Sequence, residues 1–154
     1  MRKPFFLFAA AIVALLLGSC KKEDQSAIDD QLILEHIAAH PELSAAEKTA
    51  SGLYYVISDS GSVDHPGITN TVVVFYRGTL LDGTEFDAVA SPSAPLELPL
   101  ANTIFGWQEG IPMFGRGGTG VLLIPSELGY GKQRAGAIPP NSVLKFEIEL
   151  VDFY

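Results

Sequence analysis

The stretch VLKFEIELVDF, residues 143–153, decides the fold class of this 154-residue chain. Apolar side chains alternate with charged ones along it, and this period of two is typical of a strand with one face buried. The apolar set is Leu144, Phe146, Ile148 and Leu150, and the charged set is Lys145, Glu147 and Glu149. The stretch therefore predicts a long strand whose apolar face lies on a core.

Further strands are predicted on the N-terminal side of this stretch. The segment TVVVFYR, residues 71–77, is β-branched and aromatic, and Asp82-Gly83 marks a hairpin. Shorter strands are expected at 53–57, 96–98 and 121–124, whereas 125–140 is a loop rich in Gly and Pro. Only 106–111, closed by Pro112, has room for a short helix here. We expect an α+β fold: an antiparallel β half-barrel wrapped around one short α-helix.

An extra N-terminal helix is predicted at about residues 27–39. Five apolar residues recur there at helical spacing before Pro41: Ile28, Leu32, Ile33, Ile37 and Ala38. The preceding Ser26-Ala27-Ile28-Asp29 resembles a capping box. The apolar stripe is expected to pack on the main domain or on a partner chain.

Residues 1–19 have the pattern of a cleaved export signal. Arg2 and Lys3 precede 13 apolar residues, 5–17, a run shorter than the roughly 20 that a spanning helix needs. The ending Leu17-Gly18-Ser19-Cys20 resembles a bacterial lipobox, so Cys20, the single cysteine, is the expected lipidation site. Residues 20–50 then form a lipid-anchored tether with the short helix, and residues 51–154 remain for one domain.

Charge and tether composition indicate the partners and the compartment. Loss of residues 1–19 removes two cations and takes the formal charge from −8 to −10, which disfavours nucleic acid and anionic headgroups. Membrane attachment is therefore expected through the acyl chains alone. Lys21 after the cysteine argues against inner-membrane retention, so we expect the outer membrane, facing the periplasm. Because residues 21–24, KKED, resemble a surface-export tether, the cell surface is the second choice.

The residue types present in the predicted domain exclude most common kinds of catalytic site. All three histidines, His36, His40 and His65, precede the strand-rich core, so a histidine-dependent nucleophile there lacks its base. No metal or cofactor is expected. The segment GRGGTG, residues 115–120, matches a dinucleotide fingerprint, but a strand follows it where a helix is needed. We interpret those glycines as a tight connection.

Aromatic and large apolar residues at loops and strand ends form the remaining pattern. Three segments carry it: residues 76–87 with Tyr76, DGTEFD and its Phe86-Asp87 pair; residues 104–110, IFGWQEG; and residues 124–150 with IPSELGYG, IPPNS and LKFEIEL. Their order and spacing resemble the FKBP-type peptidyl-prolyl cis/trans isomerases over residues 51–153. The resemblance implies an isomerase domain at 51–154 that acts on unfolded, proline-containing exported proteins.

The resemblance also implies a shallow hydrophobic pocket for a proline ring. Trp107 would form its floor, Tyr130 would donate a hydrogen bond to a substrate carbonyl, and the N–H of Ile104 would bind another. Asp87 would lie at the rim. The remaining walls would be Tyr76, Phe86, Phe146 and Ile138, with Leu96 where the family often has an aromatic residue and Thr103 where it has an aliphatic one. Residues 88–94 lack the arginine that often pairs with the aspartate.

Such a pocket suits a reaction in which no bond is made or broken. Rotation about Xaa-Pro costs about 18–20 kcal/mol because it breaks amide resonance. An apolar site disfavours the charge-separated planar amide more than the twisted one, so neither nucleophile nor base is required. The departures from the family pattern leave a second hypothesis, a proline-segment binding module or chaperone with weak or no catalysis. Each ring could also simply fill the core.

Overall fold

The structure is a computed structural model that describes residues 24–90 and 94–154. The predicted signal segment, Cys20 and residues 21–23 of the tether lie outside the described residues. No helix among the described residues is long and apolar enough to cross a bilayer.

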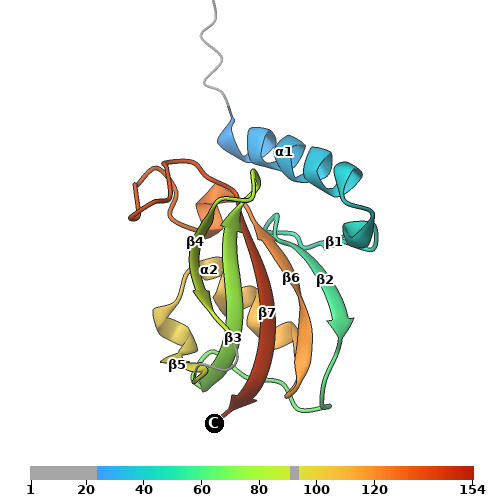
Figure 1. The fold of residues 1–154 in the computed structure, drawn as a ribbon, viewed down its shortest axis with the longest axis vertical. Helices are drawn as coiled ribbons and strands as arrows, with labels where there is room; N and C mark the ends of the chain where they lie inside the picture. The colour runs from blue at the N-terminus through green and yellow to red at the C-terminus, as the bar shows by residue number, and fades with distance from the viewer. Residues whose placement is uncertain (1–23, 91–93) are drawn as a thin grey trace, which may run out of the picture.

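The described chain forms a curved antiparallel sheet in the strand order β1-β2-β6-β7-β3-β4, with β5 also paired to β3 (Figure 1). The strands are β1 (Glu47–Lys48), β2 (Tyr54–Asp59), β3 (Thr71–Leu80), β4 (Glu85–Val89), β5 (Leu96–Pro99), β6 (Gly118–Ile124) and β7 (Leu144–Phe153). The α+β half-barrel expected from the sequence is therefore confirmed. The C-terminal stretch VLKFEIELVDF contains β7, which pairs with β3 and β6 along most of its length.

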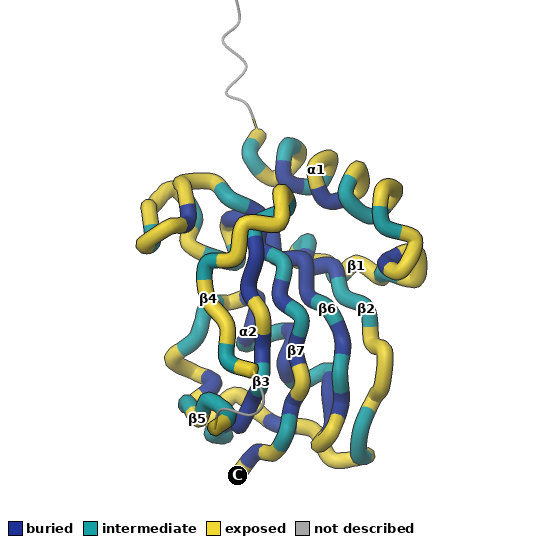
Figure 2. The backbone as a smooth tube through the Cα atoms, viewed as in Figure 1, coloured by how far each residue is buried: buried dark blue, intermediate teal, exposed yellow. Residues whose placement is uncertain are grey.

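The alternation in β7 separates the two faces of the sheet. Leu144, Phe146, Ile148 and Leu150 are all buried in one core cluster with Trp107, whereas Glu149 is exposed. Figure 2 shows that the neighbouring strands are covered more fully: β3 is mostly buried, and β6 has only buried and intermediate positions.

One short helix, α2 (Phe105–Gly110), packs against the sheet and continues into the 3-10 helix η3 (Ile111–Met113). Gly106 and Gly110 bring it close to β6, since a Cβ on either would lie 2.5 Å from Ile124 or Leu122 respectively. This close approach fixes Trp107, which lies between the two glycines in the sequence. Two further 3-10 helices are η2 (Leu100–Asn102) and η4 (Ser126–Leu128), the latter inside the expected loop.

The N-terminal helix α1 (Gln25–Ala39) is followed by η1 (Pro41–Leu43) and lies across one end of the sheet (Figure 1). It packs on the main domain: Ile33 is fully buried in a second cluster with Leu43, Tyr54, Leu123 and Val143. The apolar stripe is narrower than expected. Leu32 is 42% exposed because its position points away from this cluster, and Ala38 is exposed as well.

The predicted capping box at Ser26 is wrong. The helix begins at Gln25, two residues before the predicted start at about residue 27, and the Asp24 side chain accepts the Ser26 N–H at 3.2 Å as its N-cap. Asp29, the expected acid of the box, has its carboxylate bound to Ser126 instead. Asp29 therefore makes a tertiary hydrogen bond to Ser126 rather than the local capping contact that the motif predicts.

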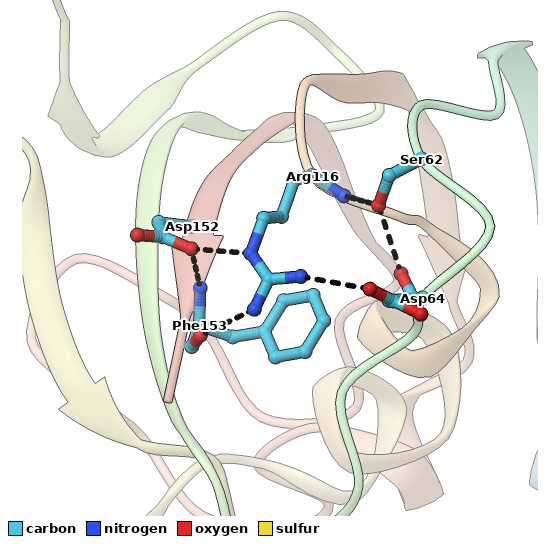
Figure 3. A network of polar contacts seen from close by, with 5 residues as sticks. All are labelled: Ser62, Asp64, Arg116, Asp152 and Phe153. Carbon is cyan, nitrogen blue, oxygen red and sulfur yellow. Dashed lines mark hydrogen bonds and ion pairs between the residues drawn. The ribbon is translucent and has the colours of Figure 1, made fainter.

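Residues 115–117 of the GRGGTG segment form a connection, as expected, whereas residues 118–120 already belong to β6. Arg116 holds three pieces of chain together (Figure 3). Its guanidinium carbon lies 3.9 Å from the Phe153 ring centroid, its Nε donates to Asp152 at 2.6 Å, and its Nη2 donates to the Phe153 carbonyl at 3.1 Å. Ser62 Oγ accepts from the Arg116 N–H at 3.0 Å. The contacts tie the loop after β2 to the end of β7.

Candidate functional site

A cavity of about 620 Å³ opens between the β3–β4 hairpin, β5, α2 and the loop after η4. All ten pocket residues predicted from the sequence line it: Tyr76, Phe86, Asp87, Leu96, Thr103, Ile104, Trp107, Tyr130, Ile138 and Phe146. They come from segments far apart in the chain, so the fold brings them together. The structure places them around one opening, and the role of each residue stays a prediction.

Four aromatic rings form the apolar body of the cavity. Trp107 contacts Tyr76 and Phe146 edge to face, each with ring centroids 5.2 Å apart, and Phe86 meets Phe146 at 5.5 Å. Trp107, Tyr76 and Phe146 are also members of the core cluster, with at most 8% of each exposed. The core-filling and pocket-lining interpretations are therefore compatible, because each of these rings belongs to the core cluster and also lines the cavity.

Gly78 of β3 makes room for this arrangement. A Cβ at Gly78 would lie 2.5 Å from Phe86 Cε2 and 2.9 Å from Phe146 Cε1. Both partner strands meet here, since Gly78 pairs with Asp87 on β4 and with Phe146 on β7. The missing side chain lets two rings converge over the backbone.

The polar groups of the cavity lie at its edge. Tyr76 Oη donates to Asp87 Oδ2 at 2.5 Å, so this phenol holds the carboxylate in place of the arginine that residues 88–94 lack. Tyr130 is 42% exposed, which leaves its hydroxyl accessible at the rim. The Trp107 indole N–H is buried and has no acceptor among the described residues.

The N-terminal side of α2 is held by side-chain hydrogen bonds. Gln108 Nε2 donates to the Thr103 carbonyl at 2.7 Å, and Thr103 Oγ1 donates to the Leu100 carbonyl at 2.7 Å. Thr103 therefore presents little free polarity to the cavity. Ile104 follows directly as the N-cap residue of α2, with an extended backbone.

Sequence reasoning missed five lining residues: Leu98, Asn102, Ala135, Gly136 and Ala137. Leu98 could have been found, because it lies two residues after Leu96 on a strand and so on the same face. Ala135, Gly136 and Ala137 form a turn closed by hydrogen bonds between Ala135 and Ile138. Small residues in a loop carry no periodic signal, so their position depends on the fold.

Burial raises the pKa of Tyr76, and the hydrogen bond to Asp87 and the negative charge of Asp87 raise it further. A raised pKa means that neutral Tyr76 stabilises the fold fully below its unfolded pKa of about 10, and that this contribution is lost as pH rises beyond it. We expect the free energy of unfolding of wild type to exceed that of Tyr76→Phe at about pH 8, and the difference to shrink above about pH 10. Urea unfolding at both pH values measures it. A difference that stays constant would contradict the assignment.

The described residues offer no metal centre: no group of three or more His, Cys, Asp or Glu side chains is placed to hold an ion. His36 and His40 stack with ring centroids 4.0 Å apart, and His40 Nδ1 is 2.8 Å from the His36 carbonyl oxygen. The two histidines contact each other at the C-terminal end of α1, and neither lines the cavity.

The fold and this site define a small α+β domain with a ring-lined pocket in which the described lining residues include neither histidine nor cysteine. The chain belongs to the family of FKBP-type peptidyl-prolyl cis-trans isomerases, whose sequence model matches residues 63–151.

Named relatives agree with this membership. The chain is 39% identical over 133 residues to "FKBP-type peptidyl-prolyl cis-trans isomerase FkpA" of Buchnera aphidicola, and 38% identical over 135 residues to the protein of that name from Escherichia coli K12. These alignments cover 86% and 88% of this chain but 52% and 50% of the relatives. The chain therefore spans about half the length of the curated relatives it matches.

Solved structures share the fold. The crystal structure of FkpA from Escherichia coli superposes with a TM-score of 0.70 at 35% identity, covering 84% of this chain and 62% of that one. A peptidyl-prolyl cis-trans isomerase from Pseudomonas syringae superposes with a TM-score of 0.69 at 28% identity, covering 83% of this chain and 95% of that one. The second comparison shows that a chain of similar extent exists as a crystallised isomerase.

Proposed function

We propose that this chain accelerates cis/trans rotation of Xaa-Pro bonds in exported polypeptides by holding the proline in the ring-lined cavity. The observation that carries the proposal is the convergence of all ten predicted residues on one opening of about 620 Å³. The Trp107 ring closes the inner end against Tyr76 and Phe146. A proline ring placed there is removed from water on most sides.

The proposed mechanism is differential stabilisation of the twisted amide. Planar Xaa-Pro has a resonance dipole that the apolar rings solvate poorly, and the twisted form has lost it. The Tyr130 hydroxyl and the Ile104 N–H are the proposed donors to substrate carbonyls flanking the bond. Each 1.4 kcal/mol or so by which these contacts favour the twisted state is worth about tenfold in rate.

A protease-coupled assay on a short peptide containing Xaa-Leu-Pro-Phe tests the proposal. The form beginning at Lys21 contains every described residue and is the one to use. We expect acceleration at micromolar protein, and Tyr130→Phe is expected to lower kcat/KM about fivefold, the worth of one hydrogen bond of about 1 kcal/mol. Peptide binding without acceleration would instead establish the binding module. Unchanged activity in Tyr130→Phe would remove Tyr130 from the site.

We further propose that Cys20 is acylated and anchors the domain to the outer membrane, facing the periplasm, with residues 20–50 as tether and α1. The lipobox-like ending at Cys20 and the acidic mature charge support this. The full chain is expected to fractionate with membranes and incorporate labelled palmitate, while Cys20→Ser is expected to do neither. Equal membrane association of both would contradict lipidation, and protease treatment of intact cells separates periplasmic from surface placement.

A further inference from the structure

Asp29 of α1 is a fully buried carboxylate that lies outside the cavity lining. Its Oδ2 accepts from the Ser126 N–H at 2.7 Å and from Ser126 Oγ at 2.6 Å, and its Oδ1 accepts from Gln25 Nε2 at 2.8 Å. A buried carboxylate is costly unless its oxygens are hydrogen-bonded, and here three donors surround it. Two of these three hydrogen bonds come from Ser126, which lies 97 residues further along the chain.

Ser126 passes this constraint on to the tyrosine at the rim. It is the first residue of η4, and its carbonyl oxygen accepts from the N–H of Gly129 at 3.0 Å and of Gly131 at 2.8 Å. Those two glycines flank Tyr130. The Gly131 carbonyl in turn accepts from the Asn141 N–H at 2.7 Å. Ser126 is thus bound to α1 through its N–H and its hydroxyl. Its carbonyl oxygen binds the backbone on both sides of Tyr130.

Tyr130 depends on this backbone more than the other rings do. The other four rings of the cavity pack against one another, whereas Tyr130 is 42% exposed and has no ring partner among the described residues. Packing therefore contributes little to its position, and the hydrogen bonds at its flanks set where the hydroxyl lies.

The next residue of α1 makes a comparable contact with a different target. Asp30 Oδ1 accepts from Tyr54 Oη at 2.7 Å and from Lys48 Nζ at 2.5 Å, so it ties the helix to β2 and β1. None of these groups belongs to the loop of Tyr130. Asp30 is therefore a matched control for a carboxylate that docks α1 without reaching the loop.

We propose that Asp29 is a positioning residue for Tyr130 and that α1 is thereby a working part of the isomerase domain. This inference rests on the proposed function only for its kinetic consequence. The helix lies outside residues 63–151, the span that matches the family model. Residue Asp29 touches no part of the cavity and acts through Ser126 and the two glycines.

The kinetic test is a double-mutant cycle in the form beginning at Lys21, measured below the unfolding temperature of every variant. Asp29→Asn keeps the shape but loses the charge and one acceptor, and we expect about a threefold fall in kcat/KM because the rim hydroxyl is displaced. In the Tyr130→Phe background the same change is expected to have no further effect, and Asp30→Asn is expected to leave activity unchanged in both backgrounds. An equal loss from Asp29→Asn with and without the Tyr130 hydroxyl would overturn the proposal.

Amide hydrogen exchange tests the same claim without any activity. Asp29→Asn is expected to speed exchange of the Gly131 N–H about tenfold, Ser126→Ala to speed it less, and Asp30→Asn to leave it unchanged. If wild type does not accelerate peptide isomerisation, the proposed function fails, and the Gly131 exchange alone decides the positioning claim. Exchange that is unchanged in Asp29→Asn, or equally raised in Asp30→Asn, would refute it.

Discussion

Trp107→Ala is expected to lose about 3–5 kcal/mol of folding free energy and to lower kcat/KM by at least about 100-fold. The indole is 5% exposed and belongs to the core cluster, so truncation leaves a void that the glycine-packed α2 cannot close. It also removes the edge-to-face partner of Tyr76 and Phe146. Part of the cavity lining and part of the core disappear together.

Urea unfolding and the peptide assay, both at a temperature where the variant is folded, measure these two losses. Phe105→Ala is the matched control, because Phe105 is the neighbouring aromatic residue on α2 but is 65% exposed and absent from the cavity lining. Its effect on stability is expected to stay within about 0.5 kcal/mol. If Trp107→Ala retained wild-type activity, the proline would have to bind elsewhere.

Gly78→Ala is expected to cost about 1–3 kcal/mol of stability by overpacking and to lower kcat/KM roughly tenfold or more. One added methyl group would lie 2.5 Å from Phe86 Cε2 and 2.9 Å from Phe146 Cε1, so both rings must move. Phe146 is buried and packs against Trp107 and Tyr76, so we expect its displacement to shift the cavity walls.

Gly67→Ala provides the comparison for Gly78→Ala. At Gly67 the nearest atom to an added Cβ is Asn70 Oδ1 at 3.6 Å, an ordinary contact, so activity and stability should be unchanged. The two variants make the same chemical change at glycines of different surroundings. Equal stability and equal activity of the two variants would mean that the packing of Phe86 and Phe146 over Gly78 does not affect function.

Strands with strong period-two patterning were predictable from the local sequence, whereas the lining of the cavity was predicted from the resemblance of the ordered motifs to a known family. The alternation along β7 places Phe146 on the buried face, and the glycines around Trp107 mark a helix that packs closely. Local patterns sufficed because each of these residues is positioned by its own regular element. Only the joint order of the motifs distinguished a pocket from an ordinary core.

Features that depend on long-range contacts were not predictable. The two-residue strand β1 is too short to carry a period, and the exposed position of Leu32 reflects which side of α1 the domain covers. Asp29 has the sequence context of a cap, yet its carboxylate binds a serine 97 residues away. Asp24 caps the helix instead, because its side chain accepts a hydrogen bond from the Ser26 N–H in the first turn. For Leu32 and Asp29, the tertiary surroundings outweighed the local preference.

Exchange NMR on a Leu-Pro peptide with a catalytic amount of the form beginning at Lys21 tests the central claim most directly. Uncatalysed isomerisation takes tens of seconds, so without catalysis no exchange peaks join the cis and trans signals at mixing times of about one second. We predict that such peaks appear, that excess peptide shifts the indole N–H signal of Trp107, and that Trp107→Ala abolishes the peaks. Exchange peaks that persist in Trp107→Ala, or their absence with the wild-type protein, would contradict the account.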